Sequence, residues 1–190
     1  KDAVIAPQTV IFRASKAFNI EDYADDIQQS WLFRDCESVL TTSKHTLLVT
    51  EMMAQSLPTQ DRVHLFHGVL QAVIELTKPI ALVFKHSQQV VQPQMYLDSV
   101  GDLPVLRPGS LNVRFFNVSN SSDDMLMDTR GLSEIGLIDL QCHFRGIDPN
   151  DVSNLLYKTA LYLFENGMVI ESGNTIEGIG KGSKWICQFE

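Results

Sequence analysis

The sequence has no cluster of basic residues and no long apolar run. Its 15 Lys and Arg side chains are outnumbered by 23 Asp and Glu side chains, which gives a formal net charge of −8. Nucleic-acid binders carry a basic patch, and anionic membrane surfaces attract the same kind of patch. No stretch reaches the roughly 20 apolar residues of a membrane-spanning helix. We therefore expect no nucleic-acid partner and no membrane partner.

Cysteine is scarce, with three residues in 190. An odd number leaves at least one thiol unpaired, and the apolar or strand-like surroundings of Cys36, Cys142 and Cys187 favour buried free thiols. Free thiols are typical of a reducing compartment, so we expect a cytoplasmic protein. The first residues show no secretory signal. Because the sequence begins at Lys1 rather than Met, we expect a processed or trimmed product.

The sequence also lacks a complete metal, nucleophile or cofactor motif. His64 and His67 are three residues apart in a predicted helix, and Glu51 or His86 could complete a zinc-like set. The zincin pattern instead requires a Glu beside the first His and a second His four positions on. We therefore favour a polar helix edge, and we expect no metal and no cofactor.

A glycine-rich run from Gly178 to Ser183 has the composition of a phosphate-binding loop. Such a loop follows a strand and opens a helix, whose positive end contacts the phosphate. Here the next element, Lys184 to Phe189, has the pattern of a strand. We therefore interpret the run as a hairpin connection.

Two long helices are the clearest elements that are present. Asp148, Pro149 and Asp151 have the residue types of a helix N-terminus, and this helix ends at Asn166 before a glycine. It is apolar nearly all round, so we expect it to lie deep in the structure. Apolar residues at helical spacing predict a second helix from about Gln60 to Leu76.

Strand-like runs accompany these helices. We predict strands at Thr9 to Arg13, Thr46 to Met52, Ile80 to Lys85, Leu111 to Val118, Met125 to Thr129, Ile138 to Arg145, Met168 to Glu171 and Trp185 to Phe189. The run at 46–52 is apolar enough for a central strand, and the polar turn at 119–124 predicts a hairpin. The predicted class is α+β, with a mixed, largely antiparallel sheet and helices packed mainly on one face. We expect a single domain over 1–190, whose strand-and-helix halves would meet near 100–110, where Gly and Pro accumulate.

The strand from Ile138 to Arg145 alternates strictly between apolar and polar residues. Asp139, His143 and Arg145 share its polar face, and Arg114 on the neighbouring hairpin could join them. In a pocket, Asp139 would orient His143, His143 would transfer a proton or make a polar contact, and Arg145 would contact an anion. Alternation alone also predicts a sheet with one face on the core and one in water. These four residues are our candidate pocket, and no catalytic residue is identified.

Several segments carry a family resemblance. The run from Asp128 to Leu132, followed by Gly136 to Phe144, resembles the signature of a bacterial family classed only as a domain of unknown function. The segments Asn166 to Ile176, Leu47 to Ala54 and His86 to Val91 are similar to other parts of that family. The resemblance therefore covers most of the chain. It implies a bacterial, intracellular protein and supplies no activity, substrate or catalytic residues.

The functional prediction depends mainly on the missing motifs. We predict a non-enzymatic binding or protein-interaction module, whose partner is a protein or a small molecule. The alternative is a hydrolase or a metal-dependent enzyme that uses the polar face of the strand at 138–145.

The chain departs from the family pattern at two positions. Glu51 stands where an Asp is common, and Ile138 stands where a Pro is common. Glu51 is therefore not expected to be an obligatory ligand.

Overall fold

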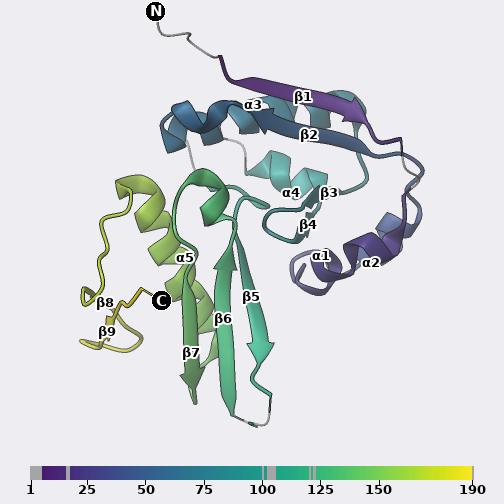
Figure 1. Ribbon diagram of the computed structural model, residues 1–190. Coiled ribbons are helices and arrows are strands. Elements are labelled where there is room, and N and C mark those ends of the chain that lie inside the picture. Colours follow the sequence, from purple (N-terminus) through teal and green to yellow (C-terminus); the bar gives the residue numbers. More distant parts are fainter. Residues whose placement is uncertain are drawn as a thin grey trace, which may run out of the picture. The chain divides into compact units, whose positions relative to one another are not determined.

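The chain forms two compact units, Lys1–Ser110 and Leu111–Glu190. Figure 1 shows the computed structural model, which describes residues 6–15, 18–99, 101, 106–119, 121 and 123–189. Both units combine helices with strands, and every strand pair in these residues is antiparallel, which confirms the predicted α+β class. The described strands are divided among four small sheets.

The main helix of the first unit is α3 (Thr59–Thr77), which confirms the helix predicted from about Gln60. Its buried side chains Leu70 and Ile74 pack with Phe84 and Tyr96 in one core cluster. The other elements of this unit are β1 (Gln8–Arg13), η1 (Ile20–Tyr23), α1 (Ala24–Gln28), α2 (Cys36–Thr41), β2 (Leu47–Met52), η2 (Ala54–Ser56), β3 (Leu82–Phe84), β4 (Gln89–Val91) and α4 (Pro93–Asp98).

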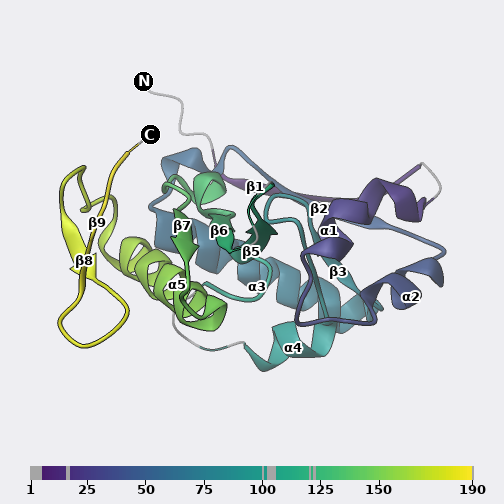
Figure 2. The ribbon, with the colours of Figure 1, turned by 90° about the horizontal axis from the view of Figure 1, so that it is seen from below.

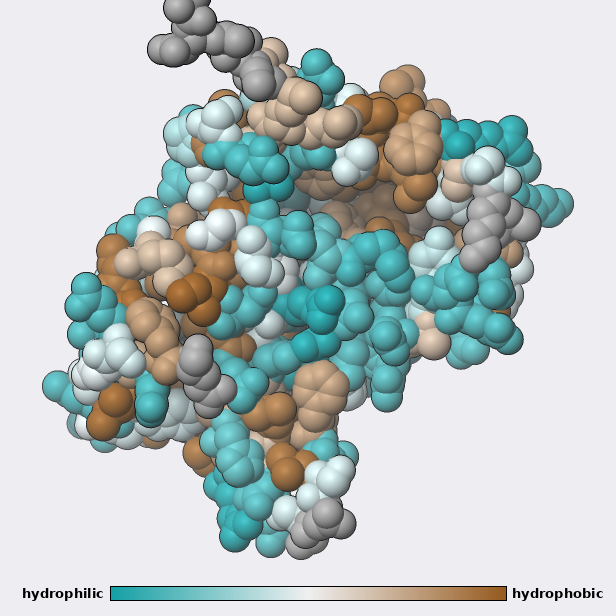
Figure 3. All heavy atoms as spheres, in the orientation of Figure 1, coloured by the Kyte–Doolittle hydropathy of each residue, from teal (hydrophilic) through white to brown (hydrophobic). Residues whose placement is uncertain are grey.

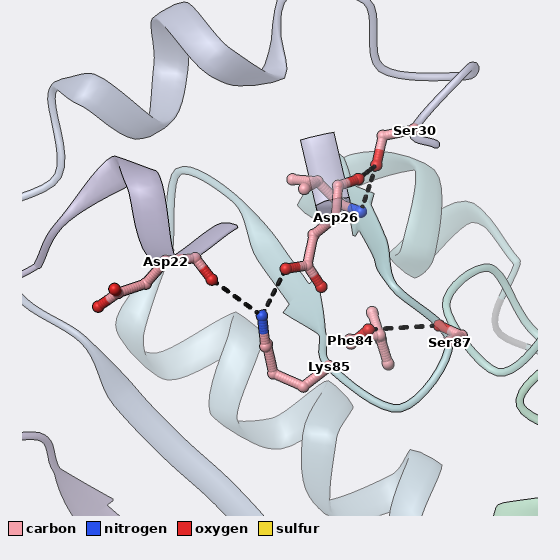
Figure 4. Close-up of polar contacts among 7 residues, drawn as sticks. Asp22, Asp26, Ser30, Phe84, Lys85 and Ser87 are labelled. Carbon is pink, nitrogen blue, oxygen red and sulfur yellow. Dashed lines mark hydrogen bonds and ion pairs between the residues drawn. The ribbon is translucent and has the colours of Figure 1, made fainter. Parts of the chain in front are cut away.

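An ion pair between the buried Asp26 and the largely exposed Lys85 joins α1 to the β3–β4 hairpin (Figure 4). The fully buried Asp26 accepts a hydrogen bond from Lys85 Nζ, and burial raises the pKa of this carboxyl group. The Ser30 hydroxyl donates to the backbone carbonyl of Asp26 and accepts a 2.7 Å hydrogen bond from the Val90 N–H. Asp26 Oδ1, by contrast, is buried without a hydrogen-bond partner among the described residues. The paired groups connect the short helix α1 to the hairpin.

The β1–β2 ribbon differs from our prediction of a central strand at 46–52. In the described residues, β2 pairs with β1 alone, and Leu47 and Leu48 are exposed. Figure 3 shows apolar surface gathered in this part of the molecule. An apolar run does not reveal how many strands will flank it, because exposed ribbons and central strands can share the same composition.

The second unit is a three-stranded antiparallel sheet with one long helix on it. The strands are β5 (Asn112–Asn117), β6 (Asp124–Arg130) and β7 (Gln141–Arg145), in that order across the sheet. Met127 and Phe144 of the sheet pack with Val152 and Leu156 of α5 (Pro149–Asn166). The remaining elements are η3 (Leu132–Ile135), β8 (Thr175–Glu177) and β9 (Lys184–Ile186). This unit places a helix on one face of its sheet, as predicted (Figure 2).

Helix α5 begins where its sequence predicts. The Asp148 side chain accepts a 2.9 Å hydrogen bond from the Asn150 N–H, and Pro149 occupies the first turn. The expectation of a deeply buried helix is wrong, because Tyr157 and Tyr162 are exposed. An aromatic ring with a hydroxyl group can lie at a boundary between core and water, so its apolar surface does not require burial all round.

The strand predicted at Met168 to Glu171 is absent, and this segment is irregular in the structure. Strand β9 pairs instead with β8, and three residues separate β8 from the end of the predicted strand. The hairpin predicted around residues 119–124 is confirmed by the pairing of β5 with β6. No helix in the described parts of the chain combines the length and the apolar character that crossing a bilayer would require.

Candidate functional site

The polar face of the β5–β6–β7 sheet carries two arginine–aspartate pairs. Arg114 lies directly across from Asp128 in the antiparallel register, and its Nε donates to Asp128 Oδ1 at 2.8 Å. The Nη2 of Arg114 also donates to Asp128 Oδ2, so the guanidinium binds both carboxylate oxygens. Such a bidentate pair fixes both side chains in the plane of the interaction.

The second pair joins Arg145 to Asp124. Both distances, Nε to Oδ1 and Nη2 to Oδ2, are 2.7 Å. The hydrogen bonds from Arg145 lower the pKa of Asp124 to about 2. His143 lies at the side of this pair, with its Nε2 4.0 Å from Asp124 Oδ1, and its side chain is 58% exposed. His143 and Arg145 therefore share one carboxylate on an accessible part of the sheet.

Asp139 lies apart from this row. Strand β7 begins only at Gln141, so the alternation that we extended back to Ile138 does not apply to Asp139. Its carboxylate accepts hydrogen bonds of 3.1 Å from Thr129 Oγ1 and from the Leu132 N–H. It therefore stabilises the turn between β6 and η3.

The structure thus places three of the four predicted pocket residues, Arg114, His143 and Arg145, on one face of the sheet, and Asp139 outside strand β7. Sequence reasoning missed the partners Asp124 and Asp128. The signal for Asp128 was available, because an antiparallel hairpin places opposite charges of β5 and β6 across from one another. Asp124 faces Arg145 on β7 instead, and the sequence assigned it to the turn. The pocket at this row stays a prediction, since the two guanidinium groups are already bound to carboxylates.

The candidate zinc set is also divided. His67 is buried, His64 is exposed, and Glu51 accepts a 2.9 Å hydrogen bond from Arg62 Nε. Across the residues that the structure describes, no group of three His, Cys, Asp or Glu side chains is placed to hold a metal ion.

A half-open groove of about 900 Å³ lies between α5 and the segment 169–180. Figures 1 and 2 show the β8–β9 hairpin beside α5. Asn154, Lys158 and Tyr162 line it from α5, at the four-residue spacing that places side chains on one face of a helix. The opposite wall includes the apolar side chains of Ile170 and Ile176. A helix surface and a hairpin thus form the two sides of one concave site.

The hairpin wall is held by close packing. Gly178 to Ser183 connects β8 with β9, which confirms the predicted hairpin connection. Trp185 and Ile179 pack on the core cluster shared by α5 and the sheet. A Cβ at Gly178 would lie 2.4 Å from Trp185 Cδ1, so only glycine allows this approach.

The groove combines apolar surface with a few charges of both signs. Asp151 and Glu177 supply carboxylates, and Lys158 supplies an ammonium group. The Thr159 hydroxyl donates a 2.8 Å hydrogen bond to the Leu155 carbonyl and so serves the helix itself. Apolar walls with a few charged groups can orient a ligand that has both apolar and polar parts. In the sequence, Tyr162 was the available signal for this surface, but we interpreted the helix as apolar nearly all round.

These features define an α+β protein with a groove between a helix and a C-terminal hairpin. Residues 128–190 match a family model described as Domain of unknown function (DUF4261). The matched segment contains all the residues that line the groove. No curated protein and no solved structure matches the chain. The family match agrees with the resemblance to a domain of unknown function and assigns no activity.

Proposed function

We propose that the protein is a non-enzymatic binding module that holds a small organic molecule in the groove beside α5. The observation that carries the proposal is the groove itself, because its volume of about 900 Å³ suits a small ligand. Small-molecule sites are typically about 300–1,000 Å³, with apolar walls and a few placed polar groups. The family match adds support, since it covers this part of the chain.

The lining residues favour binding over catalysis. Among the described residues that line the groove there is no His, Cys, Ser or Arg. These residue types make up the common nucleophile–base pairs of hydrolases. The Thr159 hydroxyl, which does line the groove, is engaged with the helix backbone. A protein segment bound in the same groove is the alternative partner.

A bacterial source and a cytoplasmic location belong to the same proposal. The resemblance at 128–144 supports the first. The three cysteines support the second, because Cys36, Cys142 and Cys187 are all free thiols. Free thiols of this kind persist most readily in a reducing compartment.

The proposal can be tested by blocking the groove. Asn154 and Glu165 are both exposed on α5, but only Asn154 lines the groove. We expect small organic fragments to bind the native protein in ligand-detected NMR. Asn154→Trp should abolish that binding because the indole fills the concavity, whereas Glu165→Trp should leave it intact.

Two results would contradict the proposal. One is that no fragment binds the native protein, and the other is that both variants bind fragments equally well. Capture of a protein partner that Asn154→Trp blocks, with no fragment binding, would establish the alternative partner instead.

A further inference from the structure

A second polar cluster lies in the first unit and was not singled out as a site from the sequence. His67 on α3 is 3% exposed, and its Nδ1 forms a hydrogen bond with the Tyr96 hydroxyl on α4. Its other ring nitrogen, Nε2, lies 3.1 Å from the Ser110 hydroxyl oxygen. Both nitrogens of this buried imidazole are therefore engaged, and Ser110, which is only partly buried, is the member nearest to solvent.

The charges around His67 have one sign. Burial, together with the positive charge of Arg107, lowers the pKa of His67 to about 3, so the ring is neutral at pH 7. The other groups whose charges act on His67 are His64 and His86, which are cations when charged. Arg107 also acts on Tyr96, where it opposes the rise in pKa that burial causes. Arg107 is thus the permanent positive charge that acts on both His67 and Tyr96.

Arg107 is the unusual member of this cluster. It is 6% exposed, and its Nη2 donates a 3.1 Å hydrogen bond to the Gly101 carbonyl. Its Nε and Nη1 atoms are buried and have no hydrogen-bond partner among the residues that the structure describes. A guanidinium group carries a permanent positive charge. Leaving such donors buried without an acceptor is costly, and native proteins usually supply an acceptor or an ion.

The loop that carries Arg107 and Ser110 is held rigidly. The Gly109 carbonyl accepts a 2.7 Å hydrogen bond from the Ser87 hydroxyl, and the Gly109 N–H donates a 2.8 Å hydrogen bond to Gln89 Oε1. The Ser110 N–H donates to the Arg107 carbonyl at 2.9 Å, which closes a tight turn. The backbone of this turn is therefore fixed before any ligand arrives, which reduces the entropy cost of binding.

We propose that Arg107 and Ser110 form a binding site for a small oxyanion, such as the phosphate or carboxylate group of a metabolite. The anion accepts hydrogen bonds from the free guanidinium N–H groups, and the Ser110 hydroxyl supplies a further polar contact beside His67. Its negative charge offsets the buried cation, and its several oxygens match several donors. The site lies wholly in the first unit and does not depend on the groove beside α5.

The test compares the stability of the full chain in phosphate and in chloride at equal ionic strength. Binding to the folded state raises the folding equilibrium constant about 100-fold when phosphate is present at about 100 times its dissociation constant. We expect this rise in the native protein and its loss in Arg107→Met. Because Arg107→Met removes a buried, unpaired charge, this variant should be at least as stable as the native protein in chloride.

Arg62→Met is the matched control. Arg62 belongs to the same unit and is paired with Glu51, so its loss should leave the response to phosphate intact. Acetate in a parallel experiment distinguishes the ligand source, because a response to acetate indicates a carboxylate and a response to phosphate alone indicates a tetrahedral anion. Ser110→Ala should weaken the response without abolishing it.

An independent measurement covers the case in which Arg107→Met does not fold. Phosphate should shift the NMR signals of the His67 imidazole and of the Arg107 Nε–H in the native protein. Equal stabilisation of the native protein and Arg107→Met would overturn the proposal, because it indicates a general salt effect. Unchanged NMR signals, or no stabilisation of the native protein, would overturn it as well.

Discussion

Arg107 of the first unit differs from the arginines on the sheet of the second unit in how many of its hydrogen-bonding groups are used. On the sheet of the second unit, Arg114 and Arg145 each bind both oxygens of an aspartate on β6. In the first unit, Arg107 is more deeply buried and has two groups without a hydrogen-bond partner among the described residues. The comparison teaches that a charged side chain becomes a candidate for binding when its own fold leaves its hydrogen-bonding capacity unused. A row of charges along a strand does not by itself indicate a binding site.

The largest expected effect is on acid stability. His67 has a pKa of about 3 in the folded protein and about 6.5 when unfolded. As the pH falls below 6.5, the unfolded chain takes up a proton that the folded chain does not. The free energy of unfolding should therefore fall by about 4 kcal/mol between pH 7 and pH 3 from this residue.

Urea denaturation over this pH range checks the prediction. His67→Gln should remove that slope, although it also removes hydrogen bonds and lowers stability at pH 7. Asp124 provides the contrast, because its stabilising contribution is present above its ordinary pKa of 3.8 and is lost as the pH falls through about 2. Asp124→Asn should therefore lower the stability by a constant amount above about pH 4 and change the slope only below about pH 4. An unchanged slope above pH 4 in His67→Gln would contradict the assignment to His67.

The next effect concerns the backbone that holds Arg107. Gly109 has φ +92°, and a Cβ there would lie 2.2 Å from the Phe84 ring. Gly109→Ala should therefore destabilise the protein by about 3 kcal/mol or more, through strain and overpacking together. Gly136 in the second unit has φ +81° with open space around it, so Gly136→Ala should cost only about 1–2 kcal/mol.

Thermal unfolding of the two alanine variants measures this difference. Equal losses would mean that the loop around Gly109 can move away from Phe84. The rigid placement of Arg107 and Ser110 would then need to be abandoned.

The smallest effect is expected on the exposed part of the sheet. His143→Ala should change the free energy of unfolding by less than about 0.5 kcal/mol, as surface substitutions usually do. The reason is that His143 is 58% exposed and lies 4.0 Å from Asp124, which Arg145 already binds. A loss above about 1 kcal/mol in urea denaturation would revive the predicted pocket at this row.

The sequence predicted the elements whose signals are local. The cap at Asp148, the helix that follows it and the β5–β6 hairpin all depend on residues close together in the chain. The three-residue strands β4 and β8 were missed, because such short strands exist only through their partners. The sequence alone could not show that strand β7 begins at Gln141, so we extended the alternation of the strand in error to Asp139.

The candidate sites were harder to predict for the same reason. The sequence favoured a polar helix edge for His67, but His67 is buried in α3, four residues after the buried Val63 and three before the buried Leu70. The partners Tyr96 and Ser110 come from segments 29 and 43 residues away, and no local pattern connects them. The groove beside α5 depends on where a hairpin packs, which is a tertiary property.

The contact of Gly178 with Trp185 also has an optical consequence. The chain contains two tryptophans, Trp31 in the first unit and Trp185 in the second. Trp31 is 54% exposed, whereas Trp185 is half-buried on the core cluster and lies against the backbone of the hairpin. Its indole emits at shorter wavelength than that of Trp31 while the second unit is folded. The fluorescence of Trp185 should therefore report whether the second unit, which contains the groove, is folded.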